Sequence, residues 1–136
     1  MQNRLKTLHF ELTDPFDNVQ VVICCKRFLK DLGFGEAQQY LIASAVSELS
    51  TNIIRYAGKG TISIGTTYRN GTVGFVVAAR DDGPGIPDLK KAMAENYSSG
   101  KGLGLGLPSV KRIMDEFEIH STPGQGTRVT AIKWLE

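Results

Sequence analysis

The sequence has few of the residues that stabilise secreted proteins or hold structural metals. Its 136 residues include two cysteines and two histidines. Cys24 and Cys25 are adjacent in a helical pattern, where neighbouring side chains diverge, so we expect no disulfide between them. Two cysteines without nearby histidines also make a poor zinc site. Both are therefore expected to be reduced residues in a partly buried, apolar setting.

Long apolar runs and an excess of one charge are also missing. The sequence has no stretch of about 18 apolar residues, and no apolar segment follows the charges of its first six residues. We therefore expect neither a membrane-spanning helix nor a secretory signal. Sixteen Lys and Arg against 14 Asp and Glu give a net charge of +2, which does not indicate a nucleic-acid partner. The sequence predicts a cytoplasmic protein with no membrane or nucleic-acid partner.

Apolar residues and glycine are abundant instead. The hydrophobic fraction of 41 % is that of a globular protein, and the length suits a single domain over residues 1–136. Six of the 15 glycines lie close together in sequence, at Gly83, Gly85, Gly100, Gly102, Gly104 and Gly106. A uniform flexible linker would not show this clustering.

Apolar periodicity predicts an order of strands and helices. The expected strands cover 7–12, 61–64, 73–79, 118–122 and 127–134, and the expected helices cover about 14–32, 36–56, 88–94 and 107–117. The first helix would begin at Asp14-Pro15 and bury Phe16, Val19, Ile23 and Leu29. Strands from distant parts of the chain must share one sheet with the long helices on one face. This order predicts a two-layer α/β sandwich.

Glu48 and Asn52 are the first candidate functional residues. Four positions apart on a predicted helix, they point the same way, so a carboxylate and an amide can meet one ligand. An isolated pair with this spacing also suits the polar face of an ordinary helix.

Two glycine-rich segments follow. In the first, 81–85 (Asp-Asp-Gly-Pro-Gly), an aspartate at a strand end can accept a hydrogen bond from a buried donor, although a tight turn would also explain the segment. In the second, 100–107 (Gly-Lys-Gly-Leu-Gly-Leu-Gly-Leu), backbone N–H groups ahead of a helix suit an anion such as a polyphosphate. The leucines argue against a linker, and flexibility there would allow a lid. Neither a P-loop motif nor the motifs of ordinary protein kinases are present in the sequence.

Together the motifs resemble the GHKL superfamily of ATP-binding domains, which includes histidine-kinase catalytic domains, the MutL and gyrase ATPases, and anti-sigma kinases. Glu48-x-x-x-Asn52 resembles its N box, Asp81-x-Gly83-x-Gly85 its first glycine box, Gly102-x-Gly104-Leu105-Gly106-Leu107 its second, and Gly126-Thr127 its last motif. The resemblance runs from about residue 36 to the end. It implies a Bergerat-type fold, with a mixed, largely antiparallel sheet and helices on one face.

The resemblance also implies roles for the matching residues. Asn52 would ligate Mg²⁺, and Glu48 would accept the proton of an attacking serine hydroxyl. Asp81 would bind the adenine amine of ATP with help from Thr127, and Gly83 and Gly85 would let the base approach the backbone. The residues that would bind the phosphates and form a lid over them are Lys101, Gly102, Leu103, Gly104, Leu105, Gly106 and Leu107.

Further stretches are similar to the RsbT-type switch kinases of the bacterial stressosome. They are Ser47-Glu48-Leu49, Asn52-Ile53, Tyr-Ala-Gly-Lys-Gly at 56–60, Asp-Gly-Pro-Gly-Ile-Pro at 82–87, Leu-Pro-Ser-Val-Lys-Arg at 107–112 and Ala-Ile-Lys-Trp-Leu at 131–135. This resemblance implies a serine/threonine kinase that phosphorylates STAS-domain partners of the RsbS and RsbR kinds. When released, it would activate an RsbU-like phosphatase.

Three alternatives stay open at this point. An anti-sigma factor of the SpoIIAB or RsbW kind would share the nucleotide site and phosphorylate an STAS antagonist, but would also sequester a sigma factor. A binding module that holds ATP without turnover would not need Glu48. A detached histidine-kinase catalytic domain is less favoured, because no helix pair with a phosphoacceptor histidine precedes the N box.

Overall fold

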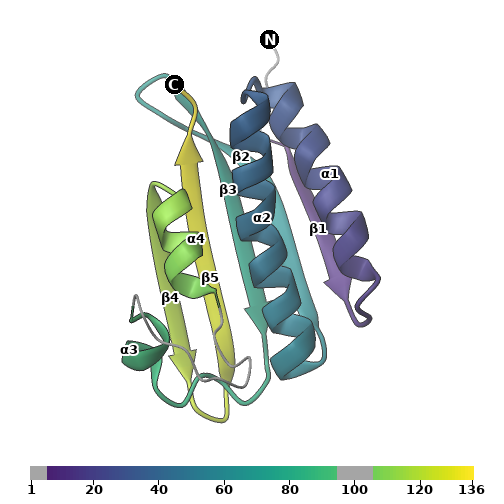
Figure 1. Cartoon of the computed structure of the whole chain (residues 1–136), viewed down its shortest axis with the longest axis vertical. Helices are drawn as coiled ribbons and strands as arrows, with labels where there is room; N and C mark the ends of the chain where they lie inside the picture. The colour runs from purple at the N-terminus through teal and green to yellow at the C-terminus, as the bar shows by residue number, and fades with distance from the viewer. Residues whose placement is uncertain (1–5, 95–105) are drawn as a thin grey trace.

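The computed structural model describes residues 6–94 and 106–136, which form one sheet with helices over one face (Figure 1). The strands are β1 (Thr7–Leu12), β2 (Gly60–Arg69), β3 (Thr72–Asp81), β4 (Glu116–Thr122) and β5 (Gly126–Trp134). The helices are α1 (Asp17–Leu32), α2 (Glu36–Asn52), the π-helical turn η1 (Ile53–Ala57), α3 (Leu89–Ala92) and α4 (Leu107–Ile113). The predicted two-layer α/β sandwich is confirmed.

The five strands are ordered β1-β2-β3-β5-β4, with β1 and β4 at the edges. All four pairings among the described strands are antiparallel, so the expectation of a mixed sheet is wrong, although the expected predominance of antiparallel pairing is confirmed. An Asn-Gly turn at residues 70 and 71 joins β2 to β3. The pairing of β3 with β5 brings residues 81 and 127 opposite each other, although 46 positions separate them in sequence.

The core lies between the sheet and the helices. Helix α2 contributes one apolar side to it, and its neighbour α1 packs alongside α2 (Figure 1). The largest fully buried side chains are Phe75, Leu12, Leu29, Ile42, Leu49, Ile62, Ile64, Leu107, Val21, Val46, Val77 and Val110. Burial of this apolar surface holds the layers together.

The predicted inner side of α1 is wrong for three of its four residues. Leu29 is buried, but Phe16, Val19 and Ile23 are exposed. The buried residues of the helix are Val21, Cys25, Phe28 and Leu29. An apolar residue at nearly every turn gives this helix two apolar sides, and helical periodicity alone does not tell which one meets the sheet. As expected, neither Cys24 nor Cys25 forms a disulfide.

Helix α1 also begins later than predicted. Asp14 does not cap the helix, because its carboxylate accepts the Phe16 N–H (2.9 Å) in the turn before it. The Asp17 carboxylate accepts the N–H groups of Thr13 (2.8 Å) and Asp14 (3.1 Å). Asp17 in the first helical turn therefore fixes the path of the chain into α1.

The second long helix reaches the expected end but changes its winding there. After Asn52 the chain forms the π-helical turn η1, and Gly58 is the C-cap of this turn. π-Helical turns are often found at functional sites. Within 6–94 and 106–136, none of the helices combines the length and the apolar character that a membrane crossing requires.

Candidate functional site

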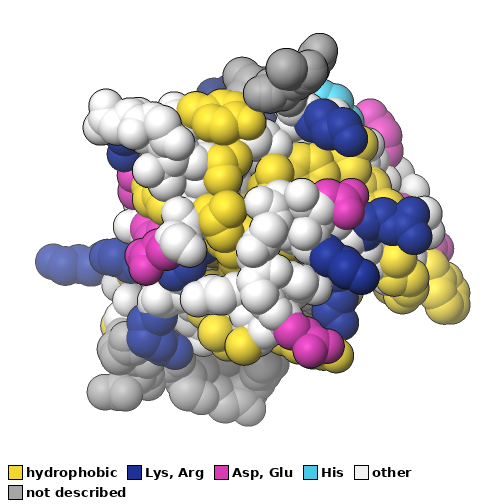
Figure 2. All heavy atoms as spheres, turned by 90° about the horizontal axis from the view of Figure 1, so that it is seen from above, with side chains coloured by type: hydrophobic (Ala, Val, Ile, Leu, Met, Phe, Trp, Pro, Cys, Tyr) yellow, Lys and Arg dark blue, Asp and Glu magenta, His cyan; other side chains and the backbone are white. Residues whose placement is uncertain are grey.

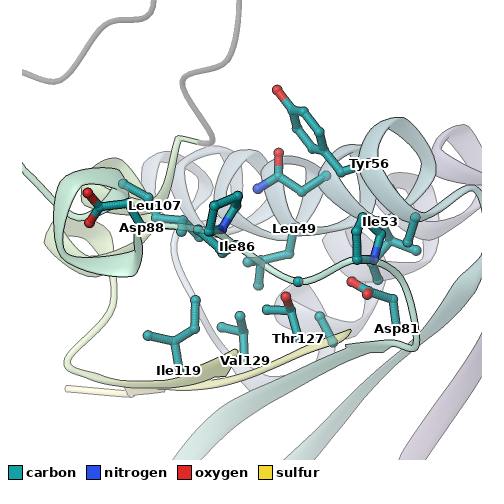
Figure 3. Close-up of a pocket in the computed structure, with 17 residues that line it drawn as sticks. Leu49, Ile53, Tyr56, Asp81, Ile86, Asp88, Leu107, Ile119, Thr127 and Val129 are labelled. Atoms are coloured by element: carbon teal, nitrogen blue, oxygen red, sulfur yellow. The ribbon is translucent and has the colours of Figure 1, made fainter. Parts of the chain in front are cut away.

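A cavity of about 430 Å³ opens between the end of α2 and the ends of β3 and β5, within the range of roughly 300–1,000 Å³ typical of ligand pockets (Figure 3). Its lining residues are Leu49, Asn52, Ile53, Tyr56, Ala57, Ala79, Asp81, Pro84, Gly85, Ile86, Pro87, Asp88, Ala92, Leu107, Ile119, Thr127 and Val129. Segments far apart in sequence therefore build one site.

Most of the cavity wall is apolar. Ile119 and Val129, on β4 and β5, lie on one side of it, and Leu49 and Ile53 lie on the helical side (Figure 3). Asp81 and Thr127 lie side by side at one end (Figure 3). An apolar cavity with a few polar anchors suits a largely apolar ligand group that carries a small number of hydrogen-bonding atoms.

Asp81 is the half-buried anchor at this end. Its Oδ1 accepts the N–H of Gly83 at 2.9 Å. Burial raises the pKa of the Asp81 carboxyl, and hydrogen bonds from the backbone amides of Gly83 and Thr127 offset part of that rise. A carboxylate held in this way can accept a hydrogen bond from a ligand amine.

Thr127 is held by a residue that the sequence did not single out. The Ser121 and Thr127 hydroxyls are 2.8 Å apart, and Ser121 Oγ also accepts the Ile86 N–H at 2.8 Å. Ser121 therefore ties the β4–β5 hairpin to the loop after β3. Its position opposite Thr127 in the strand register is the signal that could have identified it.

Gly126 lets β5 approach this loop closely. Its φ is 105°, and a Cβ there would collide with the backbone carbonyl of Asp81. Only glycine combines this backbone conformation with so close a contact. The glycine therefore sets the position of Asp81 as well as the turn.

Asn52 and Glu48 lie one helical turn apart on α2, as predicted, but only Asn52 lines the cavity. Glu48 is exposed and lies against Gly106, the residue before α4. Gly106 has a φ of 68°, and a Cβ there would collide with the Glu48 carboxylate. The start of α4 thus packs onto the proposed base.

The structure brings some of the predicted site residues into the cavity and not others. Asn52, Asp81, Gly85, Leu107 and Thr127 line it, whereas Glu48, Gly83 and Gly106 lie beside those residues. Lys101, Gly102, Leu103, Gly104 and Leu105 lie outside the described residues. Besides Ser121, prediction missed the wall residues Ile86, Pro87 and Ile119, because ordinary apolar residues carry no chemical signal.

The residues around Asn52 fit Mg²⁺ only in one way. Among the described residues, no three His, Cys, Asp or Glu side chains are placed to hold a metal ion together. Mg²⁺ commonly takes one or two protein oxygens and completes its shell with water and substrate phosphates. An amide oxygen from Asn52 with the phosphates of a nucleotide matches that pattern.

Known proteins give independent information about this chain. The family model of histidine kinase-, DNA gyrase B- and HSP90-like ATPases matches residues 37–136. The chain is 52 % identical over 106 residues to the serine/threonine-protein kinase RsbT of Bacillus subtilis (strain 168), covering 78 % of this chain and 80 % of RsbT. It is 34 % identical over 99 residues to the anti-sigma F factor of Thermoanaerobacter sp. (strain X514), covering 69 % of this chain and 68 % of that protein. The anti-sigma F factor of Bacillus licheniformis is 33 % identical over 101 residues, with the same two coverages.

Proposed function

The chain belongs to the family of histidine kinase-, DNA gyrase B- and HSP90-like ATPases and is an RsbT-type serine/threonine protein kinase, and from this premise we propose what it phosphorylates and how. In this proposal it transfers the γ-phosphate of ATP to STAS-domain partners of the RsbS and RsbR kinds in a cytoplasmic stressosome. Once released from them, it activates an RsbU-like phosphatase. Its relatives support a place in a partner-switching system.

The single observation that carries the ATP site is the pairing of Asp81 with Thr127 at the end of an apolar cavity. The Asp81 carboxylate would accept a hydrogen bond from the adenine amine, and the Thr127 hydroxyl would form a hydrogen bond with the same edge of the ring. Gly85 lines the cavity there, and the Gly83 N–H holds the carboxylate. The apolar walls would enclose the two faces of the base.

Asn52 and Glu48 would act at the phosphate end. Asn52 would provide an oxygen ligand to Mg²⁺, which when bound neutralises charge on the phosphates. Glu48 would accept the proton of the partner's serine or threonine hydroxyl as the hydroxyl oxygen bonds to the γ-phosphorus, the bond to the β–γ bridging oxygen breaks and ADP leaves. The exposed position of Glu48 suits this role, because a protein substrate has to reach it.

Gly106 and Leu107 would lie closest to the phosphates among the described residues of the second glycine motif. Gly106 packs on Glu48, and Leu107 lines the cavity. We further propose that Lys101, Gly102, Leu103, Gly104 and Leu105 complete this phosphate-binding segment.

Transfer of radiolabelled phosphate from ATP to a purified STAS-domain protein tests the proposal. Glu48→Gln keeps the shape of the side chain and removes the base, so transfer is expected to fall by roughly 10²–10⁴-fold with ATP affinity unchanged. Asn52→Ala should lower Mg²⁺-dependent transfer. Full transfer by Glu48→Gln would remove this residue as the base, and a wild type that binds no ATP would overturn the whole proposal.

A second function is an anti-sigma factor that sequesters a sigma factor and phosphorylates its antagonist. The similarity to anti-sigma F factors favours it, and both functions use the same nucleotide site. Pull-down with a sigma factor or with the N-terminal domain of an RsbU-type phosphatase separates the two. Stable capture of the sigma factor alone would favour the second function.

A further inference from the structure

The outward side of α2 leads directly to Glu48, the proposed base. Ala37, Leu41, Ser44 and Glu48 are all exposed, and their spacing of three and four residues places them along one side of the helix. Leu41 is 50 % exposed, which is unusual for a large apolar side chain in this chain. We call these four residues the α2 strip.

The helix carries no charge between its first residue and Glu48. Residues 37–47 (AQQYLIASAVS) contain no Asp, Glu, Lys or Arg. The neighbouring helix α1 carries five charged residues, which are Asp17, Lys26, Arg27, Lys30 and Asp31. Helices at a protein surface ordinarily place charged residues on their outward side. An uncharged strip can be covered by another protein at little cost, because no charge loses its water.

The position of Glu48 decides which surface a substrate has to cover. Leu107 and Asn52 line the cavity, whereas Glu48 lies outside it, exposed and in contact with Gly106 at the start of α4. A hydroxyl group that meets the Glu48 carboxylate therefore approaches from the outward side of α2. The rest of the α2 strip lies on that same side.

The size of the apolar contact suits a partner that leaves again. Seen from the end where α1 finishes and α2 begins, hydrophobic side chains lie among charged and other polar ones (Figure 2). Permanent partners bury larger and more apolar areas than a single helix strip offers. A kinase has to release its phosphorylated partner, so a small contact fits its task.

We propose that the α2 strip binds the segment of the protein substrate that carries the phosphorylated serine or threonine, with an apolar side chain of that segment against Leu41. The inference rests on the proposed role of Glu48 as the base. Leu41 precedes Glu48 by seven residues, which is about 10 Å along a helix. An extended segment spans this distance in about three residues. The phosphorylated residue and the apolar residue are therefore about three positions apart in the substrate.

Ser44 lies between the two contacts. Its side chain is small, so the backbone of the substrate can pass over it, and its exposed hydroxyl can form a hydrogen bond with that backbone. The strip contains neither Lys nor Arg, which argues against an anionic membrane as the occupant, because helices that lie on such membranes carry basic residues beside their apolar row.

Steady-state transfer of phosphate from ATP to a purified STAS-domain protein, at saturating ATP and varied concentrations of that protein, tests the contact. Leu41→Ser removes the apolar side chain and should raise the KM for the STAS-domain protein by roughly five- to tenfold, with kcat and ATP affinity unchanged. Leu41→Met keeps an apolar side chain and should give a KM close to that of the wild type.

Tyr40→Ser is the matched control. Tyr40 is 59 % exposed and adjacent to Leu41, but successive residues of a helix point about 100° apart. Its ring lies towards α1, where Lys26 Nζ is 4.0 Å from the ring centre. Tyr40→Ser should therefore leave the KM unchanged. Ser44→Trp puts a large ring on the path of the substrate and should raise the KM at least as much as Leu41→Ser, and circular dichroism checks that each variant keeps its helices.

A wild type that phosphorylates the STAS-domain protein, with the same KM in Leu41→Ser, would overturn this inference and leave the proposed function standing. Equal increases of KM in Leu41→Ser and Tyr40→Ser, or a lower kcat with an unchanged KM in Leu41→Ser, would also overturn it. A wild type that binds ATP but phosphorylates no STAS-domain protein would overturn the proposed function and this inference together.

Discussion

The two ends of the sheet differ in how their charged side chains are paired and buried. At the end where β2 turns into β3, which we call the clamp end, the Glu116 carboxylate accepts hydrogen bonds from Arg69 (2.5 and 3.3 Å) and from Trp134 Nε1 (2.9 Å). The Arg69 guanidinium also lies 4.6 Å from the centre of the Trp134 ring. The polar groups of these three side chains are therefore paired with one another.

The other end, which holds the cavity and which we call the cavity end, keeps Asp81 half-buried. Burial raises the pKa of Asp81, whereas a hydrogen bond from Arg69 lowers the pKa of Glu116. A carboxyl group whose ionised form is disfavoured by burial is often found in a functional site. This difference is consistent with the proposal that the cavity end binds a ligand, whereas the clamp end contributes to stability.

The largest effect is expected at Gly126. Alanine there combines left-handed backbone strain with a collision against the Asp81 carbonyl, so the free energy of unfolding should fall by about 2–4 kcal/mol. ATP affinity should fall as well, because Asp81 is displaced. Urea denaturation and calorimetric titration with ATP measure the two effects.

Gly124 provides the control for this change. Its φ is 82°, but no atom lies within 4 Å of a Cβ built there. Gly124→Ala should therefore show the backbone strain alone, about 1–2 kcal/mol, with ATP affinity retained. Equal losses in the two variants would show that the close contact with Asp81 is unimportant.

Asp81→Asn should weaken ATP binding by about 1.5–3 kcal/mol, or roughly 10- to 150-fold, because a charged hydrogen-bond acceptor becomes a neutral amide. The fold should be kept, and calorimetric titration measures the affinity. Asp82→Asn changes the exposed neighbour and should have little effect. If both variants bound ATP like the wild type, the assignment of Asp81 to the base would be wrong.

Trp134→Ala at the clamp end should lower the free energy of unfolding by about 1–2 kcal/mol, because the ring is partly buried over Gly74. ATP affinity should stay unchanged at the far end of the sheet. Trp134→Phe keeps an aromatic ring without the N–H to Glu116, and its loss should be smaller. A clear fall in ATP affinity in either variant would contradict the separation of the two ends.

The smallest effect concerns acid pH. Because the folded pKa of Asp81 is raised, its contribution to stability is present below the unfolded pKa and is lost as the pH rises through the folded pKa. The folded pKa of Glu116 is lowered, so its contribution is present above the unfolded pKa and is lost as the pH falls through the folded pKa.

Asp81→Asn and Glu116→Gln should therefore change the slope of unfolding free energy against pH in opposite directions. Urea denaturation at a series of acid pH values measures both slopes. Slopes that change in the same direction would contradict the opposite pKa shifts that distinguish the two ends.

Local signals in the sequence predicted much of the fold. Apolar periodicity indicated the strands on either side of Asn70-Gly71, a dipeptide that is typical of a hairpin turn. The side of α1 that meets the sheet was not predictable, because Phe16, Val19 and Ile23 are spaced like core residues. The choice depends on packing against α2 and the sheet, which no local pattern contains.

Some residues of the candidate site could likewise be predicted from the sequence and others could not. Glu48, Asn52 and Asp81 stood out because they belong to a set of motifs whose order along the chain is specific, although none of the motifs is specific alone. Ser121 did not, since a single serine in a strand acquires its role only when β4 pairs with β5 and places it opposite Thr127. The π-helical turn after Asn52 was also invisible, because no residue type marks it.

Asp81 and Thr127 form the last rung of the ladder between β3 and β5. The ends of a ladder open more readily than its middle, so the proposed adenine contact lies at the point where the two strands would first separate. A ligand that contacts both residues would keep this terminal pair in place. Part of the free energy of binding would therefore stabilise the pairing of β3 with β5. Slower hydrogen exchange of the amides of Gly83 and Thr127 upon addition of ATP would report that coupling directly.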